Sequence, residues 1–188
     1  MHAKSKTLQD NIVISPIGNL DAKLIERVAQ EVHRFFGYST DIQPLLQNVD
    51  FSFELNRRQY YSTPILERLS DLAPPHAIKI LAITRVDLFI PILTHVYGEA
   101  QLGGKSCIIS TLRLNEGLGI GVWGPFSQRV VKEAVHELGH TFNLRHCQDH
   151  TCCMHYCRSI LDVDRKSGQF CRYCKILLSD EMKKLLKK

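Results

Sequence analysis

HELGHTFNLRH, residues 136–146, is the stretch from which the rest of the chain can be interpreted. His136 and His140 are four residues apart, so a helix would place both imidazoles on one face, where their nitrogens can bind the same metal ion. Glu137 would project beside them and could take a proton from a water molecule activated by that metal. His146 supplies a third ligand and leaves the fourth zinc position open, as catalysis requires.

The helix that carries these residues must end before His146. On a continuing helix, a residue six positions beyond His140 would face largely away from the metal. Asn143 occupies the place where a left-handed residue would turn the chain, and asparagine is the non-glycine residue that best tolerates this conformation. We therefore predict a turn at Asn143. Histidines outside this stretch, such as His95, have no comparable neighbours, and we expect ordinary structural roles for them.

The sequence before residue 136 alternates between strand and helix patterns. Ser127 is the expected N-cap of the helix that carries His136, and the apolar residues of that helix form a broad stripe that would pack against a core. Asp21 and Gly37 are expected to begin and end an earlier helix. We predict strands at residues 11–17, 41–47, 59–62 and 77–84, a short helix from Pro64 to Pro74-Pro75, paired strands or a hairpin around Gly103-Gly104 within residues 86–114, and a loop at residues 117–125.

Composition places the chain among ordinary globular proteins. Its 188 residues are 44% hydrophobic and 23% charged, which suits one compact domain with a small appended lobe. No segment approaches the roughly 18 apolar residues of a membrane span, and residues 1–10 lack the apolar core of a signal peptide. We therefore expect a cytoplasmic protein with no membrane partner. The net charge of +5 includes four lysines among the last six residues, which is typical of a solvated helix end, so we do not expect nucleic acid as a partner.

Six of the seven cysteines lie within residues 147–174. In a cytosolic chain this concentration indicates metal binding or redox chemistry rather than a disulfide framework. Two pairs have the spacing of a structural zinc site: Cys147, Cys152, Cys171 and Cys174. Cys153 or Cys157 could replace one of these four ligands, whereas Cys107 is expected to be a buried small hydrophobe. Basic residues could offset the negative charge of four thiolates: Arg158, Lys166, Arg172 and Lys175.

The stretch from His136 to Cys174 resembles the archaemetzincin family of metallopeptidases, whose pattern is HExxHxxGxxHC, then C-x4-C-x-M, then C-x2-C. The resemblance implies that the three histidines bind a catalytic zinc ion, that Glu137 is the general base, and that the four paired cysteines bind a second, structural zinc. It also places Met154 at the Met-turn, beneath the catalytic zinc. Tyr156 has the spacing of the tyrosine that approaches zinc in the astacin branch of metzincins, so it is a candidate oxyanion donor.

Two positions depart from the family pattern. Asn143 replaces the glycine of the motif, and the loop between Met154 and Cys171 is one residue shorter than usual. Neither change removes a ligand. The first could alter the turn and with it the placement of His146, whereas the second only shortens a loop between the two sites.

The resemblance implies an α+β fold, with a metzincin-like mixed twisted sheet, a backing helix and an active-site helix, followed by a small zinc-bound C-terminal lobe. We expect residues 1–143 to form an N-terminal subdomain that contains the active-site helix. Residues 144–188 would form a C-terminal subdomain with the third histidine, the Met-turn and the four-cysteine site, ending in a helix over residues 179–188.

The implied function is zinc-dependent hydrolysis of peptide bonds, with Glu137 as the general base for a zinc-activated water. We expect two zinc ions, a monomer, and a peptide substrate extended along an edge strand at residues 97–102. Two alternatives remain: a zinc-binding protein of this fold with little or no peptidase activity, and a basic zinc-stabilised module that binds nucleic acid. The second alternative leaves Glu137 inside a three-histidine array unexplained.

Overall fold

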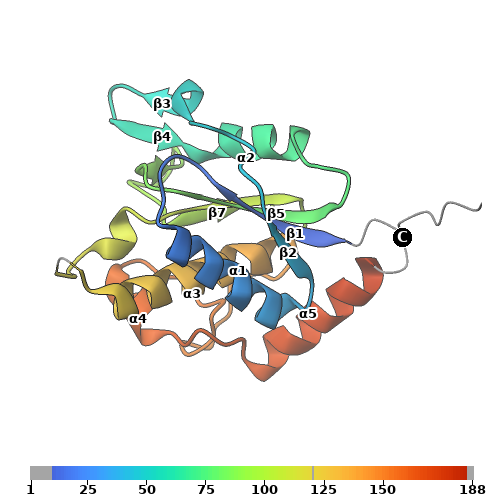
Figure 1. Cartoon of the computed structure of the whole chain (residues 1–188). Coiled ribbons are helices and arrows are strands. Elements are labelled where there is room, and N and C mark those ends of the chain that lie inside the picture. Colours follow the sequence, from blue (N-terminus) through green and yellow to red (C-terminus); the bar gives the residue numbers. More distant parts are fainter. Residues whose placement is uncertain (1–9, 120, 186–188) are drawn as a thin grey trace, which may run out of the picture.

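A central sheet organises the chain, and a computed structural model describes it over residues 10–119 and 121–185 (Figure 1). Within these residues the sheet has five strands in the order β2-β1-β5-β8-β7. All neighbours are parallel except β7 and β8, which form an antiparallel pair. The strands are β1 Asn11–Pro16, β2 Ser39–Ile42, β5 Ala77–Thr84, β7 Gly98–Ala100 and β8 Ser106–Ser110. The short antiparallel strand β7 therefore lies at one edge of the sheet.

Helices cover both faces of this sheet, because alternate residues of its strands point to opposite sides. Helices α1 (Ala22–Phe36) and α3 (Trp123–Thr141) lie on one face, and α2 (Ser62–Asp71) lies on the other (Figure 1). One core cluster joins α1 and α3 to Ile12, Ile14, Leu81, Ile83, Cys107 and Ile109. The other joins α2 to Val13, Ile80, Ala82 and Ile108. The expected α+β architecture with a backing helix and a second helix below the sheet is confirmed.

A small second sheet lies above the first, on the side of α2 (Figure 1). It consists of β3 (Phe53–Glu54), β4 (Gln59–Tyr61) and β6 (Leu88–Phe89), and a 3-10 helix η1 (Asp50–Ser52) precedes it. A second 3-10 helix, η2 (Arg113–Asn115), follows β8. The sequence pattern predicted only β4, because strands of two residues are too short to show an alternating pattern.

The chain after α3 has little regular structure until its last helix. Helix α4 (Ile160–Arg165) is short, and its N-terminus is closed by a capping box between Ser159 and Asp162. Helix α5 (Arg172–Leu185) begins seven residues before the predicted terminal helix, and residues 186–188 of that prediction lie outside the described part of the chain. Within the described part, no helix is long and apolar enough to cross a membrane.

Several helix and strand ends differ from the prediction. Helix α1 is capped as expected, by the Asp21 side chain and by Gly37 in the left-handed region. Helix α3, however, begins at Trp123, and the Ser127 hydroxyl donates to Gly124 O within its first turns instead of capping it. Pro125 lies in that first turn, where a missing N–H costs no hydrogen bond. Likewise β2 is shorter than predicted and displaced towards the N-terminus, and α2 begins two residues before Pro64.

Candidate active site and metal centres

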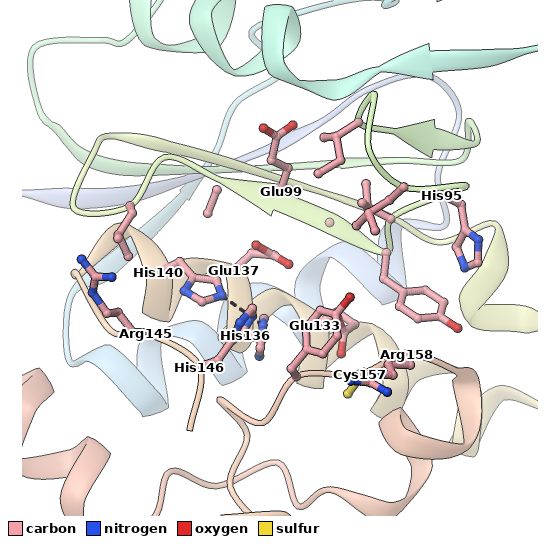
Figure 2. Close-up of a pocket in the computed structure, with 18 of the residues that line it drawn as sticks. His95, Glu99, Glu133, His136, Glu137, His140, Arg145, His146, Cys157 and Arg158 are labelled. Atoms are coloured by element: carbon pink, nitrogen blue, oxygen red, sulfur yellow. Dashed lines mark hydrogen bonds between the residues drawn. The ribbon is translucent and has the colours of Figure 1, made fainter. Parts of the chain in front are cut away.

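The histidine cluster consists of His136, His140 and His146, and one ring nitrogen of each lies within 4.8 Å of those of the other two (Figure 2). Helix α3 presents the first two on one face, with 3.1 Å between their Nε2 atoms. His146 comes from the loop beyond the helix and packs its ring against both. The structure thus brings together the three histidines that the motif predicts.

Backbone carbonyls fix the orientation of two of these rings. His136 Nδ1 lies 2.8 Å from Cys153 O, and His140 Nδ1 lies 2.7 Å from Leu144 O. A carbonyl can only accept, so each Nδ1 carries the proton and each Nε2 keeps its lone pair for a metal. Burial lowers the pKa of all three histidines, that of His140 to about 4, so the rings are neutral at pH 7. Neutral imidazoles with converging lone pairs fit a zinc ion.

The turn that returns His146 to the cluster is centred on Asn143. Its φ of 64° is left-handed, as predicted. The N–H groups of Asn143 and Leu144 donate to the carbonyls of His140 and Gly139 at the helix end. These bonds satisfy carbonyls that a helix C-terminus otherwise leaves without partners. Asparagine therefore performs the conformational role of the glycine in the motif.

Glu137 lies between the helix and the edge strand β7, in direct contact with Gly98. A Cβ added at Gly98 would lie 2.6 Å from Glu137 Cγ and 2.7 Å from Ile108 O, so only glycine allows this close approach. Burial, and then the charge of Glu133, raise the pKa of Glu137 well above its usual value, although Lys166 opposes them. A dication bound by the adjacent histidines would favour the ionised form.

A cleft of about 620 Å³ lies in front of these residues. Its floor is α3, one wall is the edge strand with the loop at residues 90–97, and the opposite wall is the chain at residues 156–158 (Figure 2). An edge strand is found within the predicted residues 97–102 but is shorter, because β7 covers Gly98–Ala100 and is the last strand of the described sheet. His95, for which we predicted no special role, also lines the cleft.

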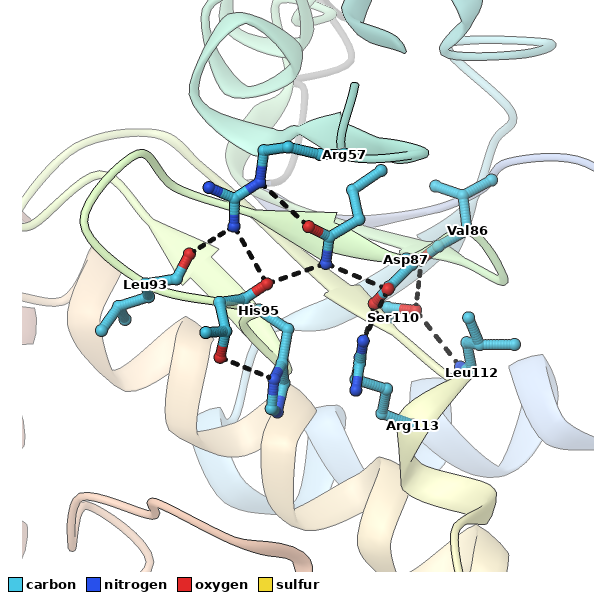
Figure 3. Close-up of polar contacts among 10 residues, drawn as sticks. Arg57, Val86, Asp87, Leu93, His95, Ser110, Leu112 and Arg113 are labelled. Carbon is cyan, nitrogen blue, oxygen red and sulfur yellow. Dashed lines mark hydrogen bonds and ion pairs between the residues drawn. The ribbon is translucent and has the colours of Figure 1, made fainter. Parts of the chain in front are cut away.

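A polar network holds in place the loop at residues 90–97, which we call the upper wall of the cleft (Figure 3). Arg57 donates to Leu93 O and Thr94 O, and the Gln59 amide donates to Thr94 O and to Asp87. Arg113 forms a two-pronged ion pair with Asp87, with N–O distances of 2.6 and 2.7 Å. The loop at residues 90–97 is therefore tied to the small sheet and to η2.

The cysteine cluster consists of Cys147, Cys152, Cys171 and Cys174, whose sulfur atoms lie within 4.8 Å of one another. The backbone N–H of Cys171 donates to Cys152 Sγ, and that of Cys174 donates to Cys171 Sγ. Burial raises the pKa of Cys171, but hydrogen bonds from the Cys174 N–H and from the neighbouring thiols outweigh it and leave that pKa below its usual value. Four converging sulfurs with N–H donors fit a closed zinc site.

The other candidates for this site lie elsewhere. Cys153 donates to Lys132 O and Cys157 lines the cleft, so neither belongs to the cysteine cluster. Cys107 is fully buried under the sheet, as predicted. Lys166 does not face the cysteine cluster, contrary to the prediction, because it is buried in an ion pair with Glu133.

Comparison with known proteins places the chain in a family. A family model described as Peptidase family M54 matches residues 51–180. The chain belongs to peptidase family M54. The archaemetzincin of Methanopyrus kandleri is 33% identical over 165 residues, covering 87% of this chain and 90% of the relative. The archaemetzincin of Archaeoglobus fulgidus is 36% identical over 163 residues, with 87% and 95% covered.

Solved structures of M54 relatives share the fold. The crystal structure of Methanopyrus kandleri archaemetzincin has a TM-score of 0.83 at 29% identity and covers 96% of this chain and 99% of that one. A structure described as a zinc-dependent peptidase from Methanocorpusculum labreanum has a TM-score of 0.78 at 26% identity, with 89% and 99% covered. The resemblance to archaemetzincins is thus confirmed, and the chain is a zinc metallopeptidase of family M54.

Two further predicted site residues, Met154 at the Met-turn and Tyr156 with the spacing of the astacin-branch tyrosine, lie near the histidine cluster. Met154 is fully buried, and a Cβ at Gly139 of α3 would lie 2.5 Å from its Sδ, so the methionine packs directly beneath the helix. Tyr156 lines the cleft with its ring centroid 5.0 Å from that of His146. Met154 therefore contacts the helix that carries His136 and His140, and Tyr156 borders the same cleft as the three histidines; their roles stay predictions.

Proposed function

We propose that this M54 peptidase hydrolyses peptide bonds with one zinc ion held by His136, His140 and His146 and with Glu137 as the general base. The observation that carries the proposal is the convergence of three neutral imidazoles, with a carboxylate beside them, at the floor of one cleft. Zinc held there would supply a Lewis acid that acidifies water and polarises the peptide carbonyl.

The position of Glu137 supports its proposed role as general base. Its carboxylate adjoins the first histidine and lies against Gly98, so it faces the space between the cluster and the edge strand. There it accepts a proton from the attacking water and returns that proton to the leaving amine. Tyr156 is exposed to 41% and can donate its hydroxyl to the oxyanion that develops on the carbonyl.

The edge strand is the proposed site for the substrate backbone. In the described residues β7 pairs only with β8, so the other side of β7 borders the cleft and can pair with an extended peptide. Such pairing would orient the peptide without regard to its sequence.

We further propose that Cys147, Cys152, Cys171 and Cys174 hold a second zinc with a structural role, and that residues 144–188 form a C-terminal subdomain around it. The apolar core of this segment is small: within the described residues it has a few buried apolar side chains such as Met154, Val163 and Phe170. A closed tetrahedral metal would supply the cohesion that such a segment lacks.

Glu137→Gln tests the proposed mechanism. We expect this variant to lose at least about 10²-fold in kcat on short peptides, because the amide cannot accept the proton, while its zinc content stays unchanged. Glu67→Gln, on the exposed side of α2, is the matched control and should keep full activity. Full activity in Glu137→Gln would rule out this mechanism. An unaltered chain that binds zinc but cleaves none of a peptide panel would favour the alternative of a binding protein without peptidase activity.

A further inference from the structure

One end of the cleft is closed by a buried ion pair. Glu133 lies one helical turn before Glu137 on α3, and Lys166 follows α4. Lys166 Nζ lies 2.7 Å from Glu133 Oε1, and the two side chains are 0% and 4% exposed. Both residues line the cleft. Figure 2 shows Glu133 on the side of Cys157 and Arg158 and away from His140 and Arg145.

The lysine of this pair contacts two groups at the cleft. Its Nζ lies 2.7 Å from Glu133 Oε1 and 3.5 Å from His136 Nδ1. An ammonium group and a carboxylate are thus held together in a site that excludes most solvent. Charged groups are rarely buried without a specific role.

Attachment of the C-terminal segment to α3 does not explain this pair. Arg129 already forms a two-pronged ion pair with Asp164, with both distances 2.7 Å. Lys132 donates to the carbonyls of Val163 and Asp164. These contacts secure the same segment outside the cleft. A buried ion pair is seldom more stabilising than apolar side chains of equal volume, so its presence at the cleft floor points to recognition.

Glu133 also retains capacity to accept hydrogen bonds. Its Oε1 is close to Lys166 Nζ, but among the described residues that atom has no partner with the angles of a hydrogen bond. An ionised carboxylate offers about four lone-pair sites. A donor brought by a substrate side chain would use this capacity, whereas a second carboxylate would be repelled and an aliphatic group would displace water without replacing its bonds.

We propose that Glu133 and Lys166 form the floor of a side-chain subsite that selects peptide residues ending in a hydrogen-bond donor, an amide or a cationic group, over aliphatic and acidic residues. This inference rests on the proposed function of the cleft. Glu133 supplies the acceptor, and Lys166 holds its carboxylate in place and limits its net charge. The pair therefore determines specificity and takes no part in the proton transfer at Glu137.

Peptides that differ only in one residue next to the cleaved bond, with Gln, Lys, Leu or Glu at that place, test the subsite. At one of the two flanking positions, we expect Gln and Lys to be preferred over Leu and Glu by about tenfold or more in kcat/KM. Comparison of Gln with Lys then separates recognition of a donor from recognition of a positive charge. Preference of the unaltered chain for Leu at both positions would overturn the proposal.

The double variant Glu133→Leu, Lys166→Met removes both charges at similar volume and leaves neither partner buried alone. We expect its preference to shift towards Leu by about tenfold or more, with unchanged zinc content and thermal stability no lower. Lys132→Met is the matched control, because Lys132 contacts the same segment and does not line the cleft. An unchanged ratio of Gln to Leu in the double variant would refute the subsite.

Peptide binding separates this inference from the proposed function. Calorimetric titration of the four peptides into Glu137→Gln, with and without the double substitution, measures the subsite in the absence of hydrolysis. The same order of affinities should appear. If the unaltered chain cleaves no peptide and this order of affinities still holds, the proposed function fails and the subsite stands. Equal affinities for all four peptides would reject the subsite.

Discussion

The histidine cluster and the cysteine cluster meet at the peptide bond between His146 and Cys147, yet the protein supports them in different ways. Two of the three histidines lie on α3, a helix of 19 residues whose buried face belongs to the main core. The cysteines lie at the ends of a segment whose only helix before Cys171, within the described residues, is the six-residue α4. The first cluster has a scaffold that exists without metal, and the second has almost none.

Solvent access differs in the same sense. His136 is buried and His146 is exposed, and all three histidines border the cleft. The cysteines are buried or half-buried and lie outside the cleft. An open position and a rigid frame suit catalysis, whereas a closed set of thiolates suits a metal that replaces core packing. Metal should therefore matter most for stability at the cysteine cluster and most for activity at the histidine cluster.

Cys171→Ser should have the largest effect. We expect two zinc ions per chain in the unaltered protein, loss of one in this variant, and local destabilisation of residues 147–174 by about 5 kcal/mol or more, because metal binding supplies much of the folding free energy there. Elemental analysis and hydrogen exchange would measure both effects. His146→Ala is the paired variant: it should lose the other zinc but keep the protection of α3. A single zinc in the unaltered protein would contradict the two-site assignment.

Gly98→Ala tests the rigid frame of the histidine cluster. The added methyl would lie 2.6 Å from Glu137 Cγ, so the carboxylate must move. We expect a loss of about 10²-fold in kcat, since displacing a catalytic group by about 1 Å can cost that much, with both zinc ions retained. Gly124→Ala is the control, because a methyl there meets nothing within 4 Å. Equal kcat values for the two variants would show that Glu137 tolerates displacement.

The features that the sequence could predict are those set by local spacing. The i, i+4 histidines, the left-handed Asn143, the caps of α1 and the hairpin around Gly103-Gly104 each depend on a few consecutive residues. The two cysteine pairs are also local, and only the resemblance to archaemetzincins favoured these four over Cys153 and Cys157. The structure supplied the independent reason, since both of those thiols contact other groups.

The features that the sequence could not predict come from contacts between distant segments. Glu133 and Lys166 are 33 residues apart, and no short pattern connects them. Gly98 resembles any turn glycine until β7 is placed against Glu137. His95 was expected to be ordinary because its neighbours in the cleft are neighbours only in space. Strands β3 and β6 were missed for the same reason, because strands of two residues are recognised only by the partner strands to which they are hydrogen-bonded.

Asp87→Asn should destabilise only the polar network at the loop of residues 90–97, which contains no proposed metal ligand. Burial raises the pKa of Asp87, but hydrogen bonds from Arg113 and Gln59 outweigh it, and the net pKa lies below its usual value. We expect the variant to lose about 1–2 kcal/mol in free energy of unfolding at pH 7. A depressed carboxylate pKa stabilises the fold above the unfolded value, and this contribution is lost as pH falls through the folded value. The difference between variant and unaltered protein should therefore shrink below about pH 4.

Urea unfolding at pH 7 and at pH 3, with and without chelator, measures this contribution. If the upper wall of the cleft is independent of metal, the penalty for Asp87→Asn at pH 7 should be the same in both conditions. A penalty that disappears with chelator would show that the network in Figure 3 depends on the metal sites.

The smallest expected effect is at Asn143, where the rigid helix passes into the segment that we expect to depend on metal. Alanine at a φ of 64° should cost about 1 kcal/mol, because it keeps the Cβ that is strained in the left-handed region and loses the polar side chain through which asparagine tolerates that region. Glycine has no Cβ and should be neutral or slightly stabilising. His146 reaches the cluster through this turn, so Asn143→Ala should weaken zinc at the histidine cluster by up to about tenfold and leave the cysteine cluster unchanged. Chelator competition, with Asn143→Gly as the control variant, measures the zinc affinity of each cluster separately. An equal loss of zinc affinity at both clusters would mean that they are less independent than their different supports imply.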